Sequence, residues 1–438
     1  EVNPELTGKS IGLREDDVFV REDFDPEFGV NGRYGITQNL VLDATYNPDF
    51  SHVEADTFQI TTNERFAIFF PEKRPFFLSG TEVFESPKRL VYTRRVLDPV
   101  GGVKLTGKVG SFNLGYLSSV DEGPITFEDG ENRALFNFFR LRRDLGDAGS
   151  TVGVLFTDRS ELGGVDYNRV MASDFRWAFK ERYTLTSQIA GSWTADEAGG
   201  RGRPLFTTNL SRSGRTFGWR FLFEDIHPEF RTDSGFIRRY GDVHISGQPQ
   251  FTFYGKPGAL LERVGIGINA IGYFDHYEFW EGQGPYEGKV ETYPTFYFRG
   301  DRSLTFIIRD GYFRFRPEDY ADYEVETEEG IVPFQLPDPL EHMWALATRL
   351  NVRINNATRI SGRISFREVP LYEEASRGFE FLLTPELNYR PTTSLLLNFS
   401  YTYSRLTRQH DDTRYSTTNI PGLRLQYSFS KAFYARAI

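Results

Sequence analysis

The chain has 438 residues, of which 39% are hydrophobic and 16% aromatic, and its formal net charge is −10. Mean hydropathy is −0.45, and no apolar run approaches the roughly 18 residues of a membrane helix, which excludes a helical membrane protein. The acidic balance argues against nucleic acid as a partner. Because the sequence contains no cysteine, disulfides and thiolate metal sites within the chain are also excluded.

In chain order, the expected elements are strands of period two, beginning with a candidate strand over residues 2–11. In residues 183–193 the large apolar residues fall on odd positions and the small polar residues on even positions. The same alternation returns in residues 217–224 and 395–404. Such segments are strands with one apolar and one polar face.

Charge on the polar face distinguishes a transmembrane barrel from a soluble sandwich. Between residues 344 and 367, arginines repeatedly lie opposite a stripe of leucine, isoleucine and valine. A water-filled lumen lined by charge explains this pattern, which is typical of outer-membrane barrels. Glu380, Glu386, Asp174 and Glu224 also face inward in this reading, so the charges can instead pair with one another. The predicted arginine stripe of the lumen consists of Arg349, Arg353, Arg363 and Arg367.

Short and long connections between the strands alternate, as in bacterial outer-membrane barrels with tight periplasmic turns and longer external loops. The short connections are expected near 35–38, 109–110, 145–148, 180–182, 213–214, 255–258, 300–301, 355–357, 390–393 and 430. The long connections are expected near 12–25, 48–100, 119–131, 159–165, 195–202, 227–239, 274–287, 316–339, 369–378 and 405–415.

This alternation predicts an all-β fold, a transmembrane antiparallel up-and-down β-barrel of about 22 strands. We count about 21 strands, and we expect 20–22 of them within the chain. Single-chain bacterial barrels usually have an even number of strands, so we expect one more strand and a polypeptide that continues at both ends. The whole of residues 1–438 is predicted to form a single domain in the outer membrane of a Gram-negative bacterium.

Residues 47–100 break the alternation, and irregular backbone at membrane depth must be buried in protein or lie in a wet cavity. We therefore expect this segment to fold into the lumen or to pack over the rim of the barrel. Two aromatic pairs flank a charged turn in it, which predicts a constriction of the lumen. The predicted constriction residues are Phe69, Phe70, Glu72, Lys73, Arg74, Phe76 and Phe77.

Several of these stretches together resemble a family of uncharacterised outer-membrane barrel proteins. The resemblance rests on residues 34–56, on Asn63-Glu64-Arg65-Phe66, on the block from Phe69 to Phe77 and on Tyr92-Thr93-Arg94-Arg95. It is most specific between residues 34 and 108. Members often carry, before the barrel, a module similar to family 9 carbohydrate-binding modules, and only the barrel part is present here. The family implies a fold and a compartment, but no established reaction.

Catalytic and metal-binding chemistry has little support, so we expect no enzyme activity, no cofactor and no metal. The six histidines lack the spacing of a zinc site. His227, with Asp225 and Glu229, is the best candidate for a catalytic group, and a solvated loop is the simpler interpretation. The acidic loop at 316–339 is able to hold Ca²⁺ or bridge it to lipopolysaccharide, although it lacks a calcium-loop motif.

The leading functional hypothesis is a passive, porin-like pore or transport channel, or the membrane component of an envelope assembly. A closed structural barrel that docks a periplasmic or surface protein is the first alternative. A carbohydrate-binding or carbohydrate-active protein, as the resemblance implies, is the second. The expected partners are the lipid bilayer and lipopolysaccharide, a possible protein partner and, if the lumen is open, small solutes or ions.

Overall fold

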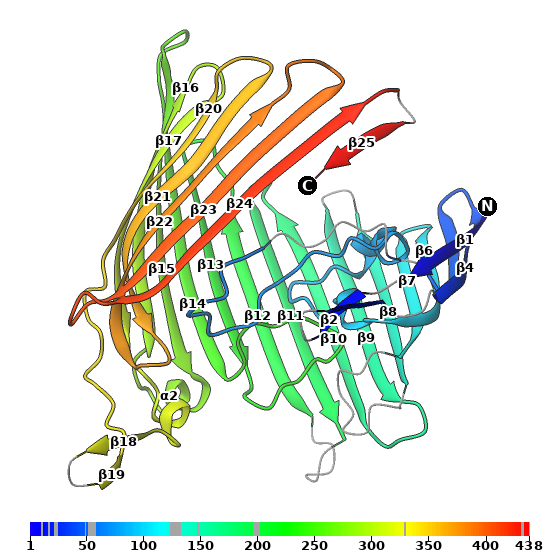
Figure 1. The fold of residues 1–438 in the computed structure, drawn as a ribbon, viewed down its shortest axis with the longest axis horizontal. Coiled ribbons are helices and arrows are strands. Elements are labelled where there is room, and N and C mark those ends of the chain that lie inside the picture. The colour runs from blue at the N-terminus through cyan, green and yellow to red at the C-terminus, as the bar shows by residue number, and fades with distance from the viewer. Residues whose placement is uncertain are drawn as a thin grey trace. The chain divides into compact units, whose positions relative to one another are not determined.

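The fold is almost entirely β structure (Figure 1). A computed structural model describes residues 1–9, 12–15, 18–21, 25–48, 50, 58–122, 133–146, 149–195, 202–327, 330–430 and 433–437. Within this part of the chain, no helix combines the length and the apolar character needed to cross a bilayer.

Most strands are 10 to 15 residues long. The first strands are β1 (Val2–Lys9), β2 (Gly12–Glu15), β3 (Val18–Arg21), β4 (Asp25–Thr37), β5 (Leu40–Tyr46), β6 (Pro99–Val109), β7 (Phe112–Asp121), β8 (Ala134–Leu145), β9 (Ser150–Glu161), β10 (Tyr167–Phe179), β11 (Tyr183–Thr194), β12 (Arg203–Arg212) and β13 (Phe217–Ile226). The remaining strands are β14 (Asp242–Tyr254), β15 (Leu261–Asp275), β16 (Glu287–Phe298), β17 (Arg302–Phe313), β18 (Glu324–Thr327), β19 (Gly330–Pro333), β20 (Ala345–Arg353), β21 (Thr358–Leu371), β22 (Ser376–Tyr389), β23 (Leu395–Arg408), β24 (Arg414–Ser428) and β25 (Tyr434–Ala437). The helices are α1 (Pro75–Leu78), η1 (Thr81–Phe84), η2 (Thr93–Arg95), α2 (His276–Trp280) and η3 (Pro317–Tyr320).

The main sheet has 21 antiparallel strands in up-and-down order. Its ladder begins at β1, which pairs with β4, and ends at β25, which pairs with β24. The prediction of an all-β, up-and-down sheet with 20–22 strands within the chain is therefore confirmed. No pairing of β1 with β25 occurs among the described residues, so closure of the sheet stays a prediction. Two small hairpins, β2–β3 and β18–β19, lie inside long connections and were not expected.

Nine of the ten short connections fall between consecutive strands where the turn residues predict them, and the one expected at 35–38 lies further on, at 38–39. The hairpin between β10 and β11 turns at Lys180 and Glu181, with φ angles of 48° and 58°. The hairpin between β16 and β17 turns in the same way at Gly300 and Asp301, with φ angles of 87° and 58°. Two successive positive φ angles are typical of the type I′ turn, whose twist matches that of paired strands. Local turn chemistry thus sets the lengths of the strands.

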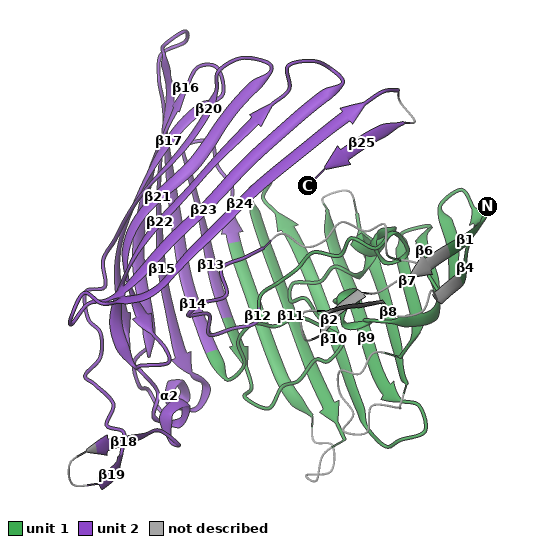
Figure 2. Ribbon diagram, in the orientation of Figure 1, with its two compact units in different colours: residues 1–56, 68–210, 224–242 green, residues 57–67, 211–223, 243–438 purple. Residues whose placement is uncertain are grey.

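The chain forms two compact units, which Figure 2 distinguishes by colour. Unit 1 comprises residues 1–56, 68–210 and 224–242, and unit 2 comprises residues 57–67, 211–223 and 243–438. The two units differ in what their strand faces carry, and each is described by itself.

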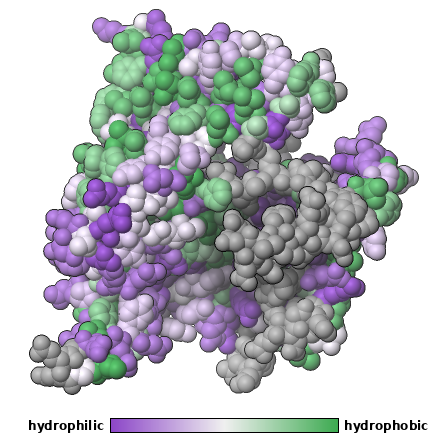
Figure 3. Space-filling model, viewed as in Figure 1, coloured by the Kyte–Doolittle hydropathy of each residue, from purple (hydrophilic) through white to green (hydrophobic). Residues whose placement is uncertain are grey.

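In unit 2, one strand face is apolar and exposed, whereas the other is polar. Leu346 and Leu350 on β20 and Ile364 on β21 are 47%, 42% and 46% exposed, while arginines occupy the alternate positions. Figure 3 shows hydrophobic residues gathered over the upper part of the unit 2 strands and hydrophilic residues toward their lower ends, near α2. Soluble proteins rarely expose such contiguous apolar surface to water. This face is therefore suited to contact with lipid or with another protein.

In unit 1, the strands carry apolar residues on both faces. Val170 and Ala172 on β10 are buried, while Met171 between them is 57% exposed on the other face. On β8, Phe136 and Phe138 are buried in the same way. The buried face is covered by residues 68–98 of the connection between β5 and β6, which therefore contribute to the core of unit 1.

Candidate functional site

The long connection between β5 and β6 contains all the predicted constriction residues, and its described part from residue 58 to residue 98 is called the insert below. Residues 58–67 belong to unit 2, and residues 68–98 belong to unit 1. In unit 1 the insert includes α1, η1 and η2.

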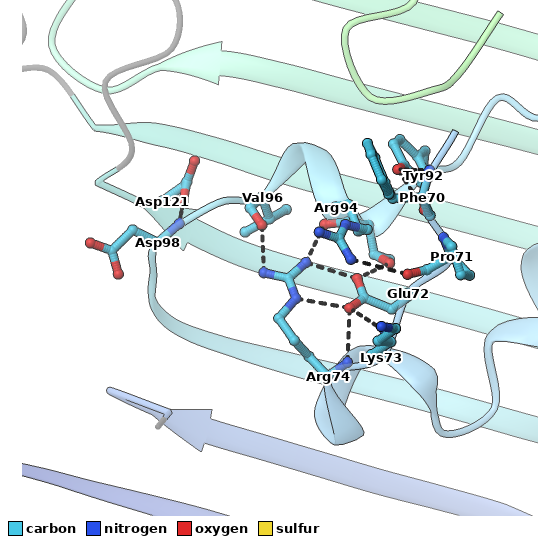
Figure 4. A network of polar contacts seen from close by, with 11 residues as sticks. Phe70, Pro71, Glu72, Lys73, Arg74, Tyr92, Arg94, Val96, Asp98 and Asp121 are labelled. Carbon is cyan, nitrogen blue, oxygen red and sulfur yellow. Dashed lines mark hydrogen bonds and ion pairs between the residues drawn. The ribbon is translucent and has the colours of Figure 1, made fainter. Parts of the chain in front are cut away.

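A carboxylate at the charged turn organises this part of the insert (Figure 4). Glu72 Oε1 accepts hydrogen bonds from the backbone N–H groups of Lys73 and Arg74 at 3.0 and 2.9 Å, and from Arg74 Nε at 2.9 Å. Glu72 Oε2 accepts from Arg74 Nη2 at 2.8 Å and from the Thr93 hydroxyl at 2.7 Å. Arg74 also donates to the carbonyls of Thr93 and Val96. The turn is thereby fastened to η2.

The same contacts set the charge state of Glu72. Burial opposes ionisation, but the hydrogen bonds and positive charge of Arg74, together with the Thr93 hydroxyl, outweigh it. The pKa of Glu72 is consequently held below its ordinary value of 4.5. The guanidinium of Arg74 lies 4.3 Å from the Phe77 ring centroid, which adds a cation–π contact to the ion pair.

Apolar side chains attach the insert to the buried face of unit 1. Phe77, Leu90 and Val96 are fully buried, and Phe84 is 4% exposed. Phe77, Phe84 and Val96 belong to one cluster with residues of β7 and β8, and Leu90 packs with residues of β9 to β12. Peeling these four side chains off the sheet would cost on the order of 6–12 kcal/mol, at about 1.5–3 kcal/mol each. The insert is thus a fixed layer on this sheet.

A buried lysine that the sequence interpretation missed also holds the insert. Lys104 on β6 is fully buried and donates to the carbonyls of Phe76 and, at 2.6 Å, Ser79. Its Nζ lies 3.5 Å from Asp43 Oδ2, and Asp43 stands directly across from both Arg33 and Lys104 in the strand register. Lys104 thereby joins α1 to a charge ladder across β4, β5 and β6.

The first aromatic pair of the predicted constriction packs against the connection between β13 and β14. The Phe69 ring lies 5.3 Å from Phe236 and 5.2 Å from Tyr92, between centroids, and the Arg89 guanidinium is 3.9 Å from the Phe69 ring. The Tyr92 hydroxyl donates to the Phe70 carbonyl at 2.6 Å. Phe69 and Phe70 are half-buried, as are Glu72, Lys73, Arg74 and Phe76. Their role as a constriction stays a prediction.

In unit 2, the insert is tied to strand ends by a single asparagine. Asn63 Nδ2 donates to the Pro370 carbonyl at 2.9 Å, and Asn63 Oδ1 accepts from the Tyr372 N–H at 3.0 Å. Arg65 pairs with Asp319 at 2.8 Å, and its guanidinium lies 5.7 Å from the Tyr286 ring. This stretch is thus bound to the ends of β21 and to the connection after β17.

The predicted arginine stripe lies on one face of β20 and β21. Arg349 and Arg363 stand directly opposite each other in the register, and Arg367 pairs with Glu380 on β22. No carboxylate lies within ion-pair distance of Arg349, Arg353 or Arg363 among the described residues. Arg309 on β17, which the sequence interpretation missed, lies on the same face of the sheet. It stands opposite Ala345 on β20, and Ala345 stands opposite Arg367 on β21. Like charges directly across a strand pair are destabilising, so this arrangement needs water or anions nearby.

Three of the four carboxylates predicted on the polar faces, Asp174, Glu224 and Glu380, pair with a positive side chain, as the alternative interpretation expects. Glu386 instead accepts hydrogen bonds from the Ser361 hydroxyl and the Asn388 amide, both at 3.1 Å. Asp174 pairs with Arg140 and Glu224 pairs with Lys88. Glu380 also accepts from Ser404 at 2.8 Å. Among the described residues of β20 and β21, Arg349, Arg353 and Arg363 lack such a carboxylate partner.

The remaining candidates for chemistry form ordinary structural contacts. His227 Nδ1 accepts from the Glu229 N–H at 3.1 Å, and Glu229 pairs with Arg203. In the acidic loop, Asp319 pairs with Arg316 and Arg65. The described part of the chain holds no group of three or more acidic or histidine side chains placed to bind a metal.

The comparison with protein families concerns the first quarter of the chain. A family model for a domain of unknown function, DUF5916, matches residues 13–106, less than a quarter of the sequence. This range overlaps residues 34–108, where the resemblance to an uncharacterised family is most specific. The expected association with carbohydrate-binding modules is not shown, and no curated protein matches the chain.

Two solved structures are similar to this chain at low sequence identity. Both are crystal structures of mutants of the ferric enterobactin receptor from Pseudomonas aeruginosa. One is 11% identical with a TM-score of 0.47, and the other is 10% identical with a TM-score of 0.49. Each match covers 98% of this chain and 73% of the receptor chain. A similarity at this level does not identify a ligand or a transported solute for this chain.

Proposed function

We propose that this chain forms an outer-membrane β-barrel that acts as a passive pore for small polar solutes. The observation that carries the proposal is the division of the unit 2 strands into an exposed apolar face and an arginine-bearing polar face. Leu346, Ile364 and Phe399 are 44–47% exposed on the first face, while Arg349 and Arg363 oppose each other on the second.

Lipid explains the apolar face, and water explains the polar face. A bilayer satisfies exposed leucine, isoleucine and phenylalanine, provided that each backbone N–H and C=O is paired between strands. Arginines without carboxylate partners need a high dielectric around them, because an unpaired charge in an apolar environment is expensive. A water-filled interior on the polar face meets that need.

In this proposal the insert narrows the pore as a fixed layer. Phe77, Phe84 and Leu90 are buried against the sheet, and exposing them is too costly for frequent opening at room temperature. The proposed pore is therefore constantly open and small, with its size set by the half-buried residues Phe69, Phe70 and Phe76.

A closed structural barrel that docks a protein partner is the second candidate. The observation in its favour is the buried inner face of unit 1, where Arg140 and Lys104 are as inaccessible as the aromatic residues. The carbohydrate role implied by the resemblance is not part of the proposal. The lipid bilayer and lipopolysaccharide are the proposed surroundings in either case.

Conductance of the purified chain in a planar lipid bilayer tests the pore. Because the protein has no cysteine, a Gly80→Cys/Thr106→Cys variant carries the only possible disulfide. A Cβ placed at Gly80 lies 3.2 Å from Thr106 Cβ, so this bond would lock η1 to β6. We expect steady conductance that is the same in the oxidised and reduced forms.

The other outcomes separate the alternatives. A conductance that rises when the disulfide is reduced would show that the insert is a gate. Absence of conductance in both forms, and in a variant without residues 64–90, would overturn the pore and favour the closed barrel.

A further inference from the structure

A basic cavity lies on unit 2 near the short connections between β12 and β13 and between β14 and β15. Its volume is about 580 Å³, within the range of small-molecule sites. Six side chains are important for its chemistry. These are Arg212, Arg215, Arg220, Arg263, Gln248 and Gln250.

The cavity concentrates positive charge without neutralising it. Among its lining residues, all of which are described, there is no aspartate or glutamate. Arg215, Arg220 and Arg263 have no carboxylate partner in the described part of the chain. Arg212 is engaged locally, because it donates to the Phe217 carbonyl. Three guanidinium groups are therefore available to a ligand.

Two of these guanidinium groups are held in place by aromatic rings. The Arg215 guanidinium lies 4.8 Å from the Tyr254 ring, and that of Arg263 lies 4.0 Å from the Tyr297 ring. The Tyr254 hydroxyl also donates to the Arg215 carbonyl at 3.1 Å. Stacking leaves the edge of a guanidinium free to donate hydrogen bonds. The arginines are thus oriented without any anion from the protein itself.

We propose that this cavity binds a small polyanion that carries phosphate or carboxylate groups. Guanidinium groups bind both oxyanions in a bidentate manner, and the amides of Gln248 and Gln250 are suited to neighbouring hydroxyl or carbonyl groups. The inference rests on the proposed pore, because it names the class of solute that the polar face attracts.

The position of the cavity favours a dissolved anion over a lipid headgroup. Gln248, Gln250 and Tyr254 occupy alternate positions of β14, whereas Phe251 and Phe253, on the opposite face, are 39% and 58% exposed. Side chains alternate between the faces of a strand. The arginines therefore share the polar face, and the face suited to lipid lies on the other side.

Calorimetric titration of the full chain in detergent micelles with citrate and with pyrophosphate tests the inference, with glucose as the uncharged comparison. We expect saturable binding of one or both anions and none of glucose. Arg220→Gln and Arg263→Gln should each weaken binding by roughly tenfold or more, because each removes a charge-assisted pair of hydrogen bonds. Lys180→Gln, which removes one charge from the turn between β10 and β11 and from no residue that lines the cavity, should leave the affinity unchanged.

Three results would overturn the inference. They are a lack of saturable binding, an equal loss of affinity in Lys180→Gln, and displacement of both anions by vesicles of phosphatidylglycerol, which would make the site a lipid site. Conductance is measured on the same preparation. Conductance without anion binding would reject the cavity and leave the pore standing, whereas anion binding without conductance would reject the pore alone.

Discussion

The guanidinium of Arg140 on β8 reaches over Gly153 on β9 to Asp174 on β10. Arg140 Nη2 lies 2.9 Å from Asp174 Oδ1, and the two side chains are 1% and 7% exposed. Gly153 stands directly across from Asp174 in the register. A Cβ at Gly153 would approach Arg140 Nη1 to 2.7 Å. Glycine at this position therefore leaves the space in which the Arg140 guanidinium reaches Asp174.

Removing one member of this pair should be more harmful than removing both. Asp174→Leu leaves a buried, unpaired Arg140 and should reduce the free energy of unfolding by about 3–5 kcal/mol. The Arg140→Leu/Asp174→Leu double variant should lie close to the parent protein. Urea unfolding in lipid vesicles, followed by tryptophan fluorescence, measures both. A double variant that is less stable than Asp174→Leu would contradict this account.

Lys104 should prove to be the main polar attachment of α1. Lys104→Met leaves the carbonyls of Phe76 and Ser79 without a donor and should cost about 2–4 kcal/mol. Lys108→Met is the matched control on the same strand, because Lys108 is half exposed and pairs with Asp144 at the surface, a contact that contributes about 0–1 kcal/mol. Thermal unfolding in detergent gives both differences. Equal losses would mean that Lys104 only fills space.

Attachment of the insert should weaken in acid through Glu72. Its pKa is lowered in the folded state, so the stabilisation is present above the ordinary pKa of 4.5 and is lost as the pH falls through the folded value. Pepsin cleavage near Phe76 and Phe77 should therefore accelerate as the pH falls from 4.5 through the lowered pKa of Glu72. Glu72→Gln should be cleaved rapidly at every pH in the pepsin range, whereas the exposed control Glu181→Gln should follow the parent. A pH profile that persists in Glu72→Gln would assign the effect to another group.

Local signals account for the parts of the fold that the sequence predicts well. A period of two and turn residues such as Lys180-Glu181 and Gly300-Asp301 act within a few positions, so strand limits and the facing of Arg349 and Arg363 are readable along the chain. In unit 1 the alternation fails on β10, because Val170 on the buried face and Met171 on the exposed face are both apolar. That pattern is a sign that one face of the sheet is covered.

The contacts of the insert depend on residues far apart in the sequence. Asn63 binds Pro370 and Tyr372 across about three hundred residues, and no local pattern specifies that pairing. Lys104 meets Asp43 only because the register of β5 and β6 brings them together. Phe77 was predicted to line a constriction, and its full burial reflects packing that only the folded sheet supplies.

The assignment of the two strand faces in unit 2 can be checked with neighbouring residues of β23. Phe399 is 44% exposed on the apolar face, so Phe399→Arg should cost about 2–4 kcal/mol if that position lies near the middle of the bilayer. Ser400→Arg, one residue on, would place its charge opposite Glu386 on β22 and should be tolerated. Folding yield into vesicles and urea midpoints compare the two. Similar behaviour of the two variants would show that the facing is wrong.

The opposed pair Arg349 and Arg363 should lower the stability of the protein and give the proposed pore a preference for anions. Relief of their repulsion in Arg349→Gln should raise the free energy of unfolding by about 0.2–1 kcal/mol. If the polar face lines the pore, the same change should shift the reversal potential in a potassium chloride gradient toward cation preference, because one positive charge leaves the wall. Arg359→Gln is the control, since Arg359 is paired with Asp301 and its loss should not improve stability. A stability gain in Arg349→Gln without any change in reversal potential would place the pair outside the conducting path.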